Sequence, residues 1–149
     1  MTPAHASQKG TVVVGVDGSA GSQLALRWAA HQANLMGDTL RVVAAWEFPM
    51  SYGWAPQLPP GIDPSNDAER MLREVVDDVV GTEDHVEIET VVVEGQPAPT
   101  LINAARGADL LVVGTRGHGE LAGIFYGSVG ERCVTHAPCP VVVVRGKAA

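Results

Sequence analysis

The sequence has few of the features that membrane-bound, secreted or nucleic-acid-binding proteins share. No stretch approaches the roughly 20 consecutive apolar residues that a helix needs to cross a bilayer. The first ten residues, MTPAHASQKG, lack the apolar segment of a secretory signal peptide. The net charge of -7 argues against binding to nucleic acid or to an anionic membrane, because both favour a basic protein surface. We therefore expect a cytoplasmic protein that binds neither nucleic acid nor membrane.

Cysteines and metal-ligand patterns are equally scarce. The chain has 2 cysteines, Cys133 and Cys139, and such a low number is typical of a reducing cytosol. The pair lacks the C-x-x-C spacing of redox motifs, and we interpret both residues as small hydrophobic side chains near Pro138 and Pro140. The 5 histidines are scattered, with no paired spacing that would indicate a metal site.

Several enzyme motifs are also missing. The sequence G-x-x-x-x-G-K-[ST] does not occur, which excludes a P-loop NTPase, and neither does the G-x-S-x-G motif of α/β-hydrolases. Residues 117–122 match G-x-G-x-x-A loosely. However, that dinucleotide-binding fingerprint belongs after the first strand of a βαβ unit, and these residues lie far along the chain. We identify no catalytic residue, so we do not expect an enzyme beyond slow, incidental hydrolysis.

The composition that is present indicates one globular domain. The 149 residues are 46% hydrophobic and 18% charged, a balance typical of a folded chain that buries a sizeable core. Aromatic residues make up only 5%, so the core must consist mainly of Val, Leu, Ile and Ala. Residues 1–9 are predicted to form a flexible lead-in, and the folded domain is expected over residues 10–146.

Strands and helices are predicted to alternate along this domain, which indicates a parallel sheet with helices on both faces. Apolar, β-branched runs predict five strands: Thr11–Val16, Leu40–Trp46, Val86–Val93, Leu110–Val113 and Val141–Val144. Helical periodicity, caps and breakers predict four helices: one capped by Ser19 that runs to Met36 before Gly37, then Asn66–Val80, Pro97–Ala105 and Ser128–His136.

Two of these segments carry further expectations. In the first helix, an apolar stripe is predicted to face the core, made of Leu24, Ala25, Trp28, Ala29 and Leu35. Between the second strand and the second helix, residues 47–64 contain five prolines, so we expect an irregular loop there. Such a long loop is either a surface insertion or a flap beside a ligand.

The most informative stretch is LLVVGTRGHGELAGIFYGS near the C-terminus. An apolar strand ends in Gly114, and the loop that follows holds Gly117 and Gly127 before Ser128 begins a helix. Glycine lets a backbone approach a ligand without an intervening Cβ. The first turn of a helix offers unpaired N–H groups and a positive dipole end to a phosphate. The pattern therefore predicts an anion-binding loop.

The spacing G-x2-G-x9-G-S resembles that of the ATP-binding branch of the universal stress protein family. The segment VVVGVDGS resembles the opening strand of the same family together with its acidic residue, here Asp17. The resemblance covers about residues 10–146. It implies an α/β domain related to the adenine nucleotide α-hydrolases, with a five-stranded parallel sheet of strand order 3-2-1-4-5. Ligands bind such sheets where the strand order reverses, which places the site between Asp17 and Gly114.

The resemblance also implies roles for the glycine-rich segment. Gly114, Gly117, Gly127, Ser128 and Val129 match positions that contact phosphate and ribose in the family. We expect the amides of Ser128 and Val129 to bind phosphate oxygens, and Gly114 and Gly117 to line the ribose and the approach to the phosphates.

Other positions are expected to complete the nucleotide site. Asp17 could accept hydrogen bonds from the ligand, help to hold a Mg2+ carried by the phosphates, or cap the following helix. The resemblance also implies an adenine-contacting backbone position near the end of the second strand, at Ala44 or Ala45, and we take Ala45. Arg116 and His118 lie within the loop, where they either add charge for a triphosphate or are solvated bystanders.

The family further implies a homodimer. The last strand, Val141–Val144, would otherwise leave an apolar edge unpaired, and a second subunit could pair with it in antiparallel orientation. We expect a stress-response or signalling module that binds ATP with Mg2+. Two alternatives remain open: a sensor or buffer for AMP or cyclic AMP, and a dimeric interaction module that acts without a nucleotide.

Overall fold

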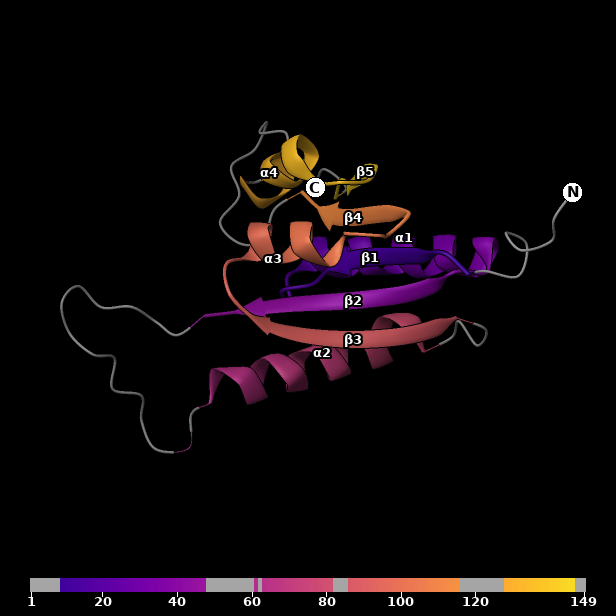
Figure 1. Ribbon diagram of the computed structural model, residues 1–149. Coiled ribbons are helices and arrows are strands. Elements are labelled where there is room, and N and C mark those ends of the chain that lie inside the picture. The colour runs from indigo at the N-terminus through magenta and orange to yellow at the C-terminus, as the bar shows by residue number, and fades with distance from the viewer. Residues whose placement is uncertain (1–8, 48–60, 62, 82–85, 116–127, 147–149) are drawn as a thin grey trace, which may run out of the picture.

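The structure, a computed structural model, describes residues 9–47, 61, 63–81, 86–115 and 128–146. These residues form five strands, β1 (Thr11–Gly15), β2 (Thr39–Trp46), β3 (Glu87–Glu94), β4 (Leu110–Gly114) and β5 (Val141–Val144). They also form four helices, α1 (Ala20–Met36), α2 (Pro64–Val80), α3 (Pro97–Ala104) and α4 (Ser128–His136). All strand pairs are parallel, in the order β3-β2-β1-β4-β5 (Figure 1). The predicted fold class and strand order are confirmed.

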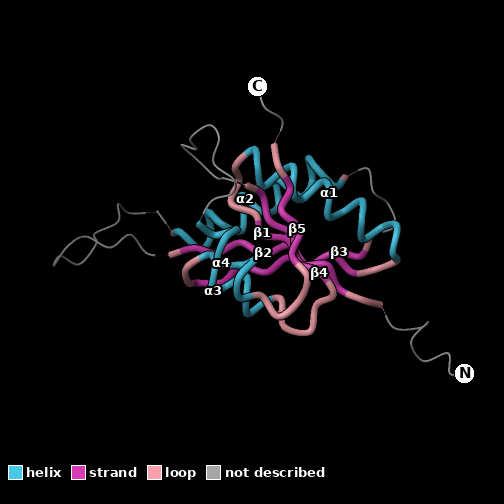
Figure 2. The backbone as a smooth tube through the Cα atoms, turned by 90° about the horizontal axis from the view of Figure 1, so that it is seen from above, coloured by secondary structure: helices cyan, strands magenta, loops and turns pink. Residues whose placement is uncertain are grey.

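The sheet has a hydrophobic layer on each face. Along β1, Val12 and Val14 belong to the cluster beneath α1 and α2, whereas Val13 belongs to the cluster beneath α3 and α4. This division follows from the alternation of side chains along a strand. Figure 2 shows α1 on one side of the strands and α3 and α4 on the other. All three valines are fully buried, as expected for a central parallel strand.

Helix α1 buries a different face from the predicted one. Ala25 and Ala29 are buried as expected, but Trp28 is 37% and Leu35 is 68% exposed. The buried face consists instead of small residues and one leucine: Ser22, Ala25, Leu26, Ala29, Ala30 and Ala33. Small side chains let the helix axis lie close to the sheet, and the bulky residues then remain on the solvent side. The predicted N-cap Ser19 and C-terminal Gly37 are confirmed.

Helix α2 begins two residues earlier than predicted, so the expected loop 47–64 was one residue too long at its end. Pro64 is the first helical residue, and the Asp63 side chain accepts hydrogen bonds from the backbone N–H groups of Ser65 (3.0 Å) and Asn66 (3.4 Å). Proline is favoured at this position because its missing N–H would have no partner in the first turn. Most of the predicted loop, and the flap hypothesis with it, lies outside the described residues.

Within the described part of the chain, no helix is long and apolar enough to cross a membrane.

Candidate nucleotide-binding site

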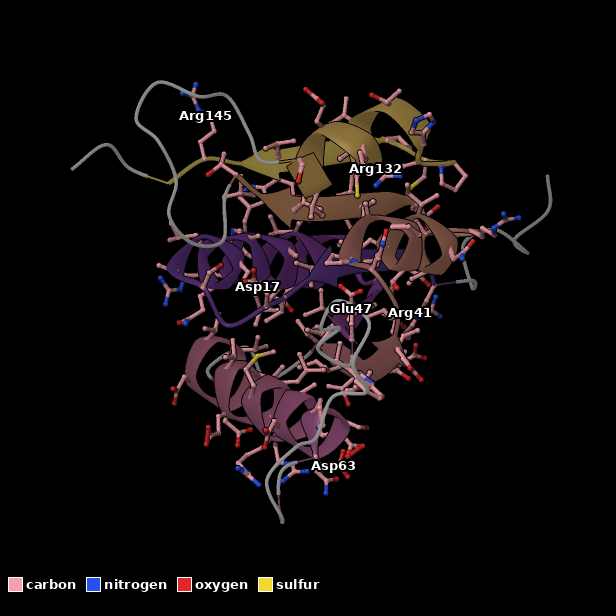
Figure 3. All side chains as sticks on the ribbon, turned by 90° about the vertical axis from the view of Figure 1, so that its left-hand side faces the viewer. Asp17, Arg41, Glu47, Asp63, Arg132 and Arg145 are labelled. Carbon is pink, nitrogen blue, oxygen red and sulfur yellow. The ribbon has the colours of Figure 1, made fainter. Side chains whose placement is uncertain are left out.

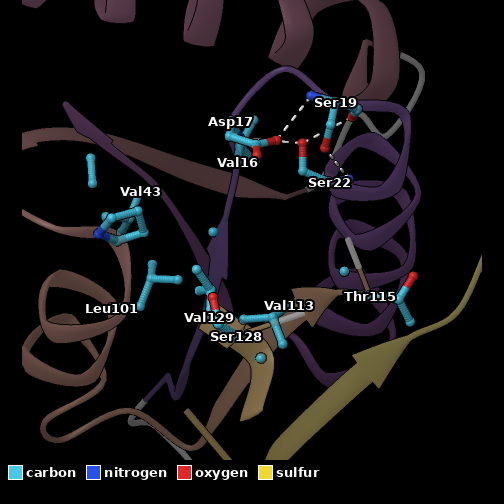
Figure 4. A pocket seen from close by; sticks show the side chains of 15 residues that line it. Val16, Asp17, Ser19, Ser22, Val43, Leu101, Val113, Thr115, Ser128 and Val129 are labelled. Atoms are coloured by element: carbon cyan, nitrogen blue, oxygen red, sulfur yellow. Dashed lines mark hydrogen bonds between the residues drawn. The ribbon is translucent and has the colours of Figure 1, made fainter. Parts of the chain in front are cut away.

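A cavity of about 400 Å³ opens at the carboxyl ends of the strands, beside the ends of the neighbouring strands β1 and β4. Figure 3 looks onto this end of the sheet and Figure 4 shows the cavity itself. Its lining comes from the ends of β1, β2 and β4 and from the starts of α1, α3 and α4: Gly15, Val16, Asp17, Ser19, Ser22, Val43, Ala45, Pro97, Leu101, Val113, Gly114, Thr115, Ser128, Val129 and Gly130. This is the switch point at which ligands bind doubly wound sheets.

One wall is a polar turn between β1 and α1. The Asp17 carboxylate accepts a hydrogen bond from the Ser19 N–H (2.9 Å), and the Asp17 N–H donates to the Ser22 hydroxyl (3.2 Å). The Ser22 hydroxyl in turn donates to the Ser19 carbonyl (3.0 Å). Gly18 has a φ of 86°, a left-handed conformation that a side chain would strain, so glycine is needed to reverse the chain here. The turn thus fixes Asp17 at the cavity (Figure 4).

The opposite wall is the start of α4. Ser128, Val129 and Gly130 form its first turn and all line the cavity. The N–H groups of a first helical turn have no acceptor within the helix, and the dipole end is positive. This wall can therefore hold an anion without a basic side chain.

The remaining wall is apolar. Val43 and Ala45 from β2, Leu101 from α3 and Val113 from β4 contribute to it. Ala44, the other candidate for the adenine contact, belongs to the core cluster under α1 and α2, on the far side of the sheet. The alternation along β2 therefore selects Ala45 rather than Ala44 as the residue that faces the cavity.

The charge of the described lining is sparse. Among the described residues that line the cavity, Asp17 is the one with an ionisable side chain. Across the described residues, no group of three or more His, Cys, Asp or Glu side chains could hold a metal ion. A cation at this carboxylate would need most of its ligands from a bound molecule, as Mg2+ does when it binds with a phosphate chain.

The structure brings five of the predicted site residues together around the cavity: Asp17, Ala45, Gly114, Ser128 and Val129. Arg116, Gly117, His118 and Gly127 lie outside the described residues. Their part in binding, and the ligand contacts of all nine positions, remain predictions.

Sequence reasoning missed several lining residues, among them Ser22, Pro97 and Leu101. Ser22 lies three residues after the cap Ser19, the spacing of a side chain that packs under the first turn, so its place could have been inferred. Leu101 looks like any core residue of a short helix, and no pattern in the sequence distinguishes it. Pro97 starts α3, as predicted, but its place at the cavity follows only from the strand order.

Comparisons with known proteins identify the family of this chain. The model of the universal stress protein family matches residues 10–145. The chain belongs to the universal stress protein family. Universal stress protein Rv2623 of Mycobacterium tuberculosis is 39% identical over 141 residues, which cover 93% of this chain and 46% of that protein. The chain therefore spans about half the length of the curated relatives it matches.

Solved structures of this family share the fold. A universal stress protein in complex with cAMP is 30% identical, with a TM-score of 0.67, and the match covers 93% of this chain and 98% of that one. The universal stress protein from Archaeoglobus fulgidus in complex with dAMP is 22% identical, with a TM-score of 0.62, and the match covers 92% and 98% of the two chains.

Proposed function

We propose that this universal stress protein binds an adenine nucleotide, ATP carried with Mg2+, in the cavity between β1 and β4, and acts through its nucleotide-dependent state in stress response or signalling. The observation that supports it is the pairing of an apolar wall with a helix start across one cavity of about 400 Å³. An apolar wall suits a base, and the free N–H groups of a first turn suit phosphates. The G-x2-G-x9-G-S spacing, which ends at Ser128 in the first turn of α4, fits the ATP-binding branch of the family.

In this proposal the adenine lies against Ala45 and Val43, and the phosphates lie at the amides of Ser128 and Val129. Gly114, Gly117 and Gly127 lie along the ribose and phosphate path, and Arg116 and His118 add charge near the outer phosphates.

Asp17 gives the proposal an electrostatic condition. A carboxylate near a phosphate chain repels it unless a cation lies between them. Mg2+ bound to the phosphates would remove that repulsion and would take Asp17 as one oxygen ligand. We therefore expect nucleotide to bind more tightly with Mg2+ than in EDTA.

Cyclic AMP is the second candidate ligand, because a universal stress protein 30% identical to this chain was solved in complex with cAMP. Cyclic AMP has a single phosphate, so it would need fewer contacts from the glycine-rich segment and no cation to offset the charge of Asp17. Competition of cyclic AMP against Mg-ATP separates the two ligands. A third possibility, an interaction module that works without nucleotide, predicts no binding of either.

The test is calorimetric titration of nucleotide-stripped protein with Mg-ATP, repeated in EDTA. Saturable micromolar binding is expected. In the Ala45→Leu variant, the larger side chain occupies the proposed base position, so the affinity should fall at least about tenfold, equivalent to about 1.4 kcal/mol. Ala104→Leu is the matched control, because Ala104 is also half-buried but lies at the end of α3 and does not line the cavity.

Equal affinities in the two variants would contradict the site. Absence of binding to the folded wild type would contradict the nucleotide proposal and favour the interaction module. Because no general base is evident, the proposal also expects slow hydrolysis, and a turnover above about 1 s⁻¹ would show an enzyme instead.

We further propose a cytoplasmic homodimer that pairs through β5. Both cysteines are free thiols, which fits a reducing compartment. Strand β5 lies at the edge of the sheet, and its four valines are each half-buried. A partner strand would satisfy the outward backbone groups and cover these side chains.

A further inference from the structure

Gly114, the first glycine of the G-x2-G-x9-G-S motif, is in close contact with helix α1. A Cβ on Gly114 would lie 2.6 Å from the carbonyl oxygen and 2.8 Å from the carbonyl carbon of Gly21, and 3.2 Å from the nitrogen of Ser22. Optimal contacts between non-bonded heavy atoms are roughly 3.5–4.0 Å. All three atoms belong to backbone, so no side-chain rotation could relieve the clash. The missing Cβ therefore serves the packing of the end of β4 against the first turn of α1.

The backbone segment that Gly114 touches is the one that holds the Asp17 turn in place. The Ser22 N–H donates to the Ser19 hydroxyl (3.2 Å), which caps α1. The Ser22 side chain accepts from the Asp17 N–H and donates to the Ser19 carbonyl. A shift of the peptide between Gly21 and Ser22 would thus move Ser19 and Ser22, the two residues whose hydrogen bonds support Asp17.

We propose that Gly114 is a positioning residue: it lets β4 lie against the first turn of α1, and this contact sets the position of Asp17 at the cavity. The assignment differs from a role in ligand approach, because a Cβ at this position would point at α1 backbone. The positioning role rests on the proposed function in one respect only, namely that Asp17 then contacts bound Mg-ATP.

Gly15 provides a matched comparison. It is the last residue of β1, as Gly114 is of the neighbouring β4, and it lines the same cavity. A Cβ on Gly15 would meet the Leu101 side chain, with Cδ1 at 2.6 Å. The end of a leucine side chain can rotate away, whereas a helix backbone cannot. The two alanine variants therefore add the same methyl group near the same cavity, but only one presses on α1.

The first test is amide hydrogen exchange in the nucleotide-free protein. Gly114→Ala should speed exchange at the amides of Asp17 and Ser22 by about tenfold or more, because local opening becomes easier there. Gly15→Ala should leave both amides unchanged. Ser22→Ala removes the hydroxyl that accepts from the Asp17 N–H and donates to the Ser19 carbonyl, without adding a clash, and should also speed exchange at Asp17. It tests the link between this part of α1 and Asp17 even if Gly114→Ala does not fold. Unchanged exchange in Gly114→Ala, or in Ser22→Ala, would overturn the proposal.

The second test is a double-mutant cycle on Mg-ATP affinity. Gly114→Ala should weaken binding about tenfold in the wild-type background, but much less in the Asp17→Asn background, since coupled residues give non-additive effects. Additive losses would mean that the added methyl group meets the ligand directly, which would overturn the positioning role. If the wild type does not bind Mg-ATP at all, the proposed function fails, and the exchange experiment still decides the role of Gly114.

Discussion

At the scale of single residues, Cys133 combines full burial with an ionisable group. Its side chain is fully buried in the cluster under α3 and α4. Burial disfavours the thiolate and raises the pKa of the Cys133 thiol from 9.0 to about 11, against a smaller lowering by the charge of Arg132. Burial also raises the pKa of the half-buried Cys139 thiol, as does the negative charge of Asp109.

This raised pKa predicts a pH dependence of stability. Above pH 9.0 the unfolded chain releases the Cys133 proton while the folded chain retains it until about pH 11, so the free energy of unfolding should fall across this window. Urea unfolding of the wild type and of Cys133→Ala, measured from pH 8 upwards, isolates the effect. The difference in the free energy of unfolding between wild type and Cys133→Ala should be constant below pH 9 and should become smaller above it. Parallel curves up to pH 11 would contradict the prediction.

At the same scale, the sequence predicted which residues line the cavity more accurately than it predicted what each of them does there. Asp17 and Ser128 follow from a strand end and a helix start, features that local sequence encodes, whereas Ala45 was expected from the family resemblance, with Ala44 as the alternative. Gly114 was expected to make room for a ligand, but a Cβ at this position would meet backbone atoms of α1. That contact joins residues more than ninety positions apart, and no local pattern reports such a distance.

At the scale of elements, the start of α2 offers a clean measurement of helix capping. Asp63→Ala removes the side chain that accepts from the N–H groups of Ser65 and Asn66. We expect a loss of about 1 kcal/mol in the free energy of unfolding, measured by urea denaturation. Asp67→Ala is the control, since it removes the same charge from the first turn that Asp63 caps, and within the described residues the Asp67 side chain makes only an exposed 3.7 Å ion pair with Arg70. Such pairs contribute little. Equal losses would show that charge rather than capping matters.

Helix boundaries were predicted correctly where the sequence holds a clear capping residue. The start of α2 was missed because we treated proline as a helix breaker at every position. Ser19 and Gly37 bound α1 as expected. Pro64 was assigned to the loop because proline breaks helices, although the first helical position tolerates it. The exposed Trp28 and Leu35 show a further limit. Apolar periodicity identifies a helix, but the choice of buried face depends on how closely that helix must approach the sheet.

At the scale of the whole molecule, the edge strand β5 carries the proposed dimer. The Leu111 N–H donates to the Pro140 carbonyl (2.9 Å). Because backbone groups alternate in direction along a strand, the N–H groups of Val141 and Val143 face away from β4. Val143→Pro would therefore remove a hydrogen bond to a partner while sparing the pairing with β4. We expect the mass measured by light scattering to fall from dimer to monomer.

The opposite edge of the sheet supplies the control. The Gly95 N–H donates to Trp46 of β2, so by the same alternation the N–H of the exposed Thr90 faces outward on β3. Thr90→Pro should leave the dimer intact. A monomeric wild type, or dissociation by both substitutions alike, would rule out β5 as the interface.

The topology illustrates how far sequence reasoning reaches at this scale. Alternating strands and helices predicted a parallel sheet with two covered faces. The order 3-2-1-4-5 followed from the resemblance of two motifs to a family, because alternation alone is compatible with several orders. The structure confirms that order, and the family match over residues 10–145 supports the resemblance on which it depended.

The central position of β1 affects how the molecule is completed during translation. Val12 in β1 pairs with Leu110 in β4. Nearly a hundred further residues must therefore be synthesised before the edge of β1 that faces away from β2 is paired. A ribosome-bound chain that ends at Glu94 already contains β1, β2, β3 and the Asp17 turn, but has neither β4 nor α4. Until those elements emerge, the nascent sheet exposes an apolar edge at its future centre, where other chains or chaperones can bind. The cavity can therefore form only after β4 and α4 have been synthesised.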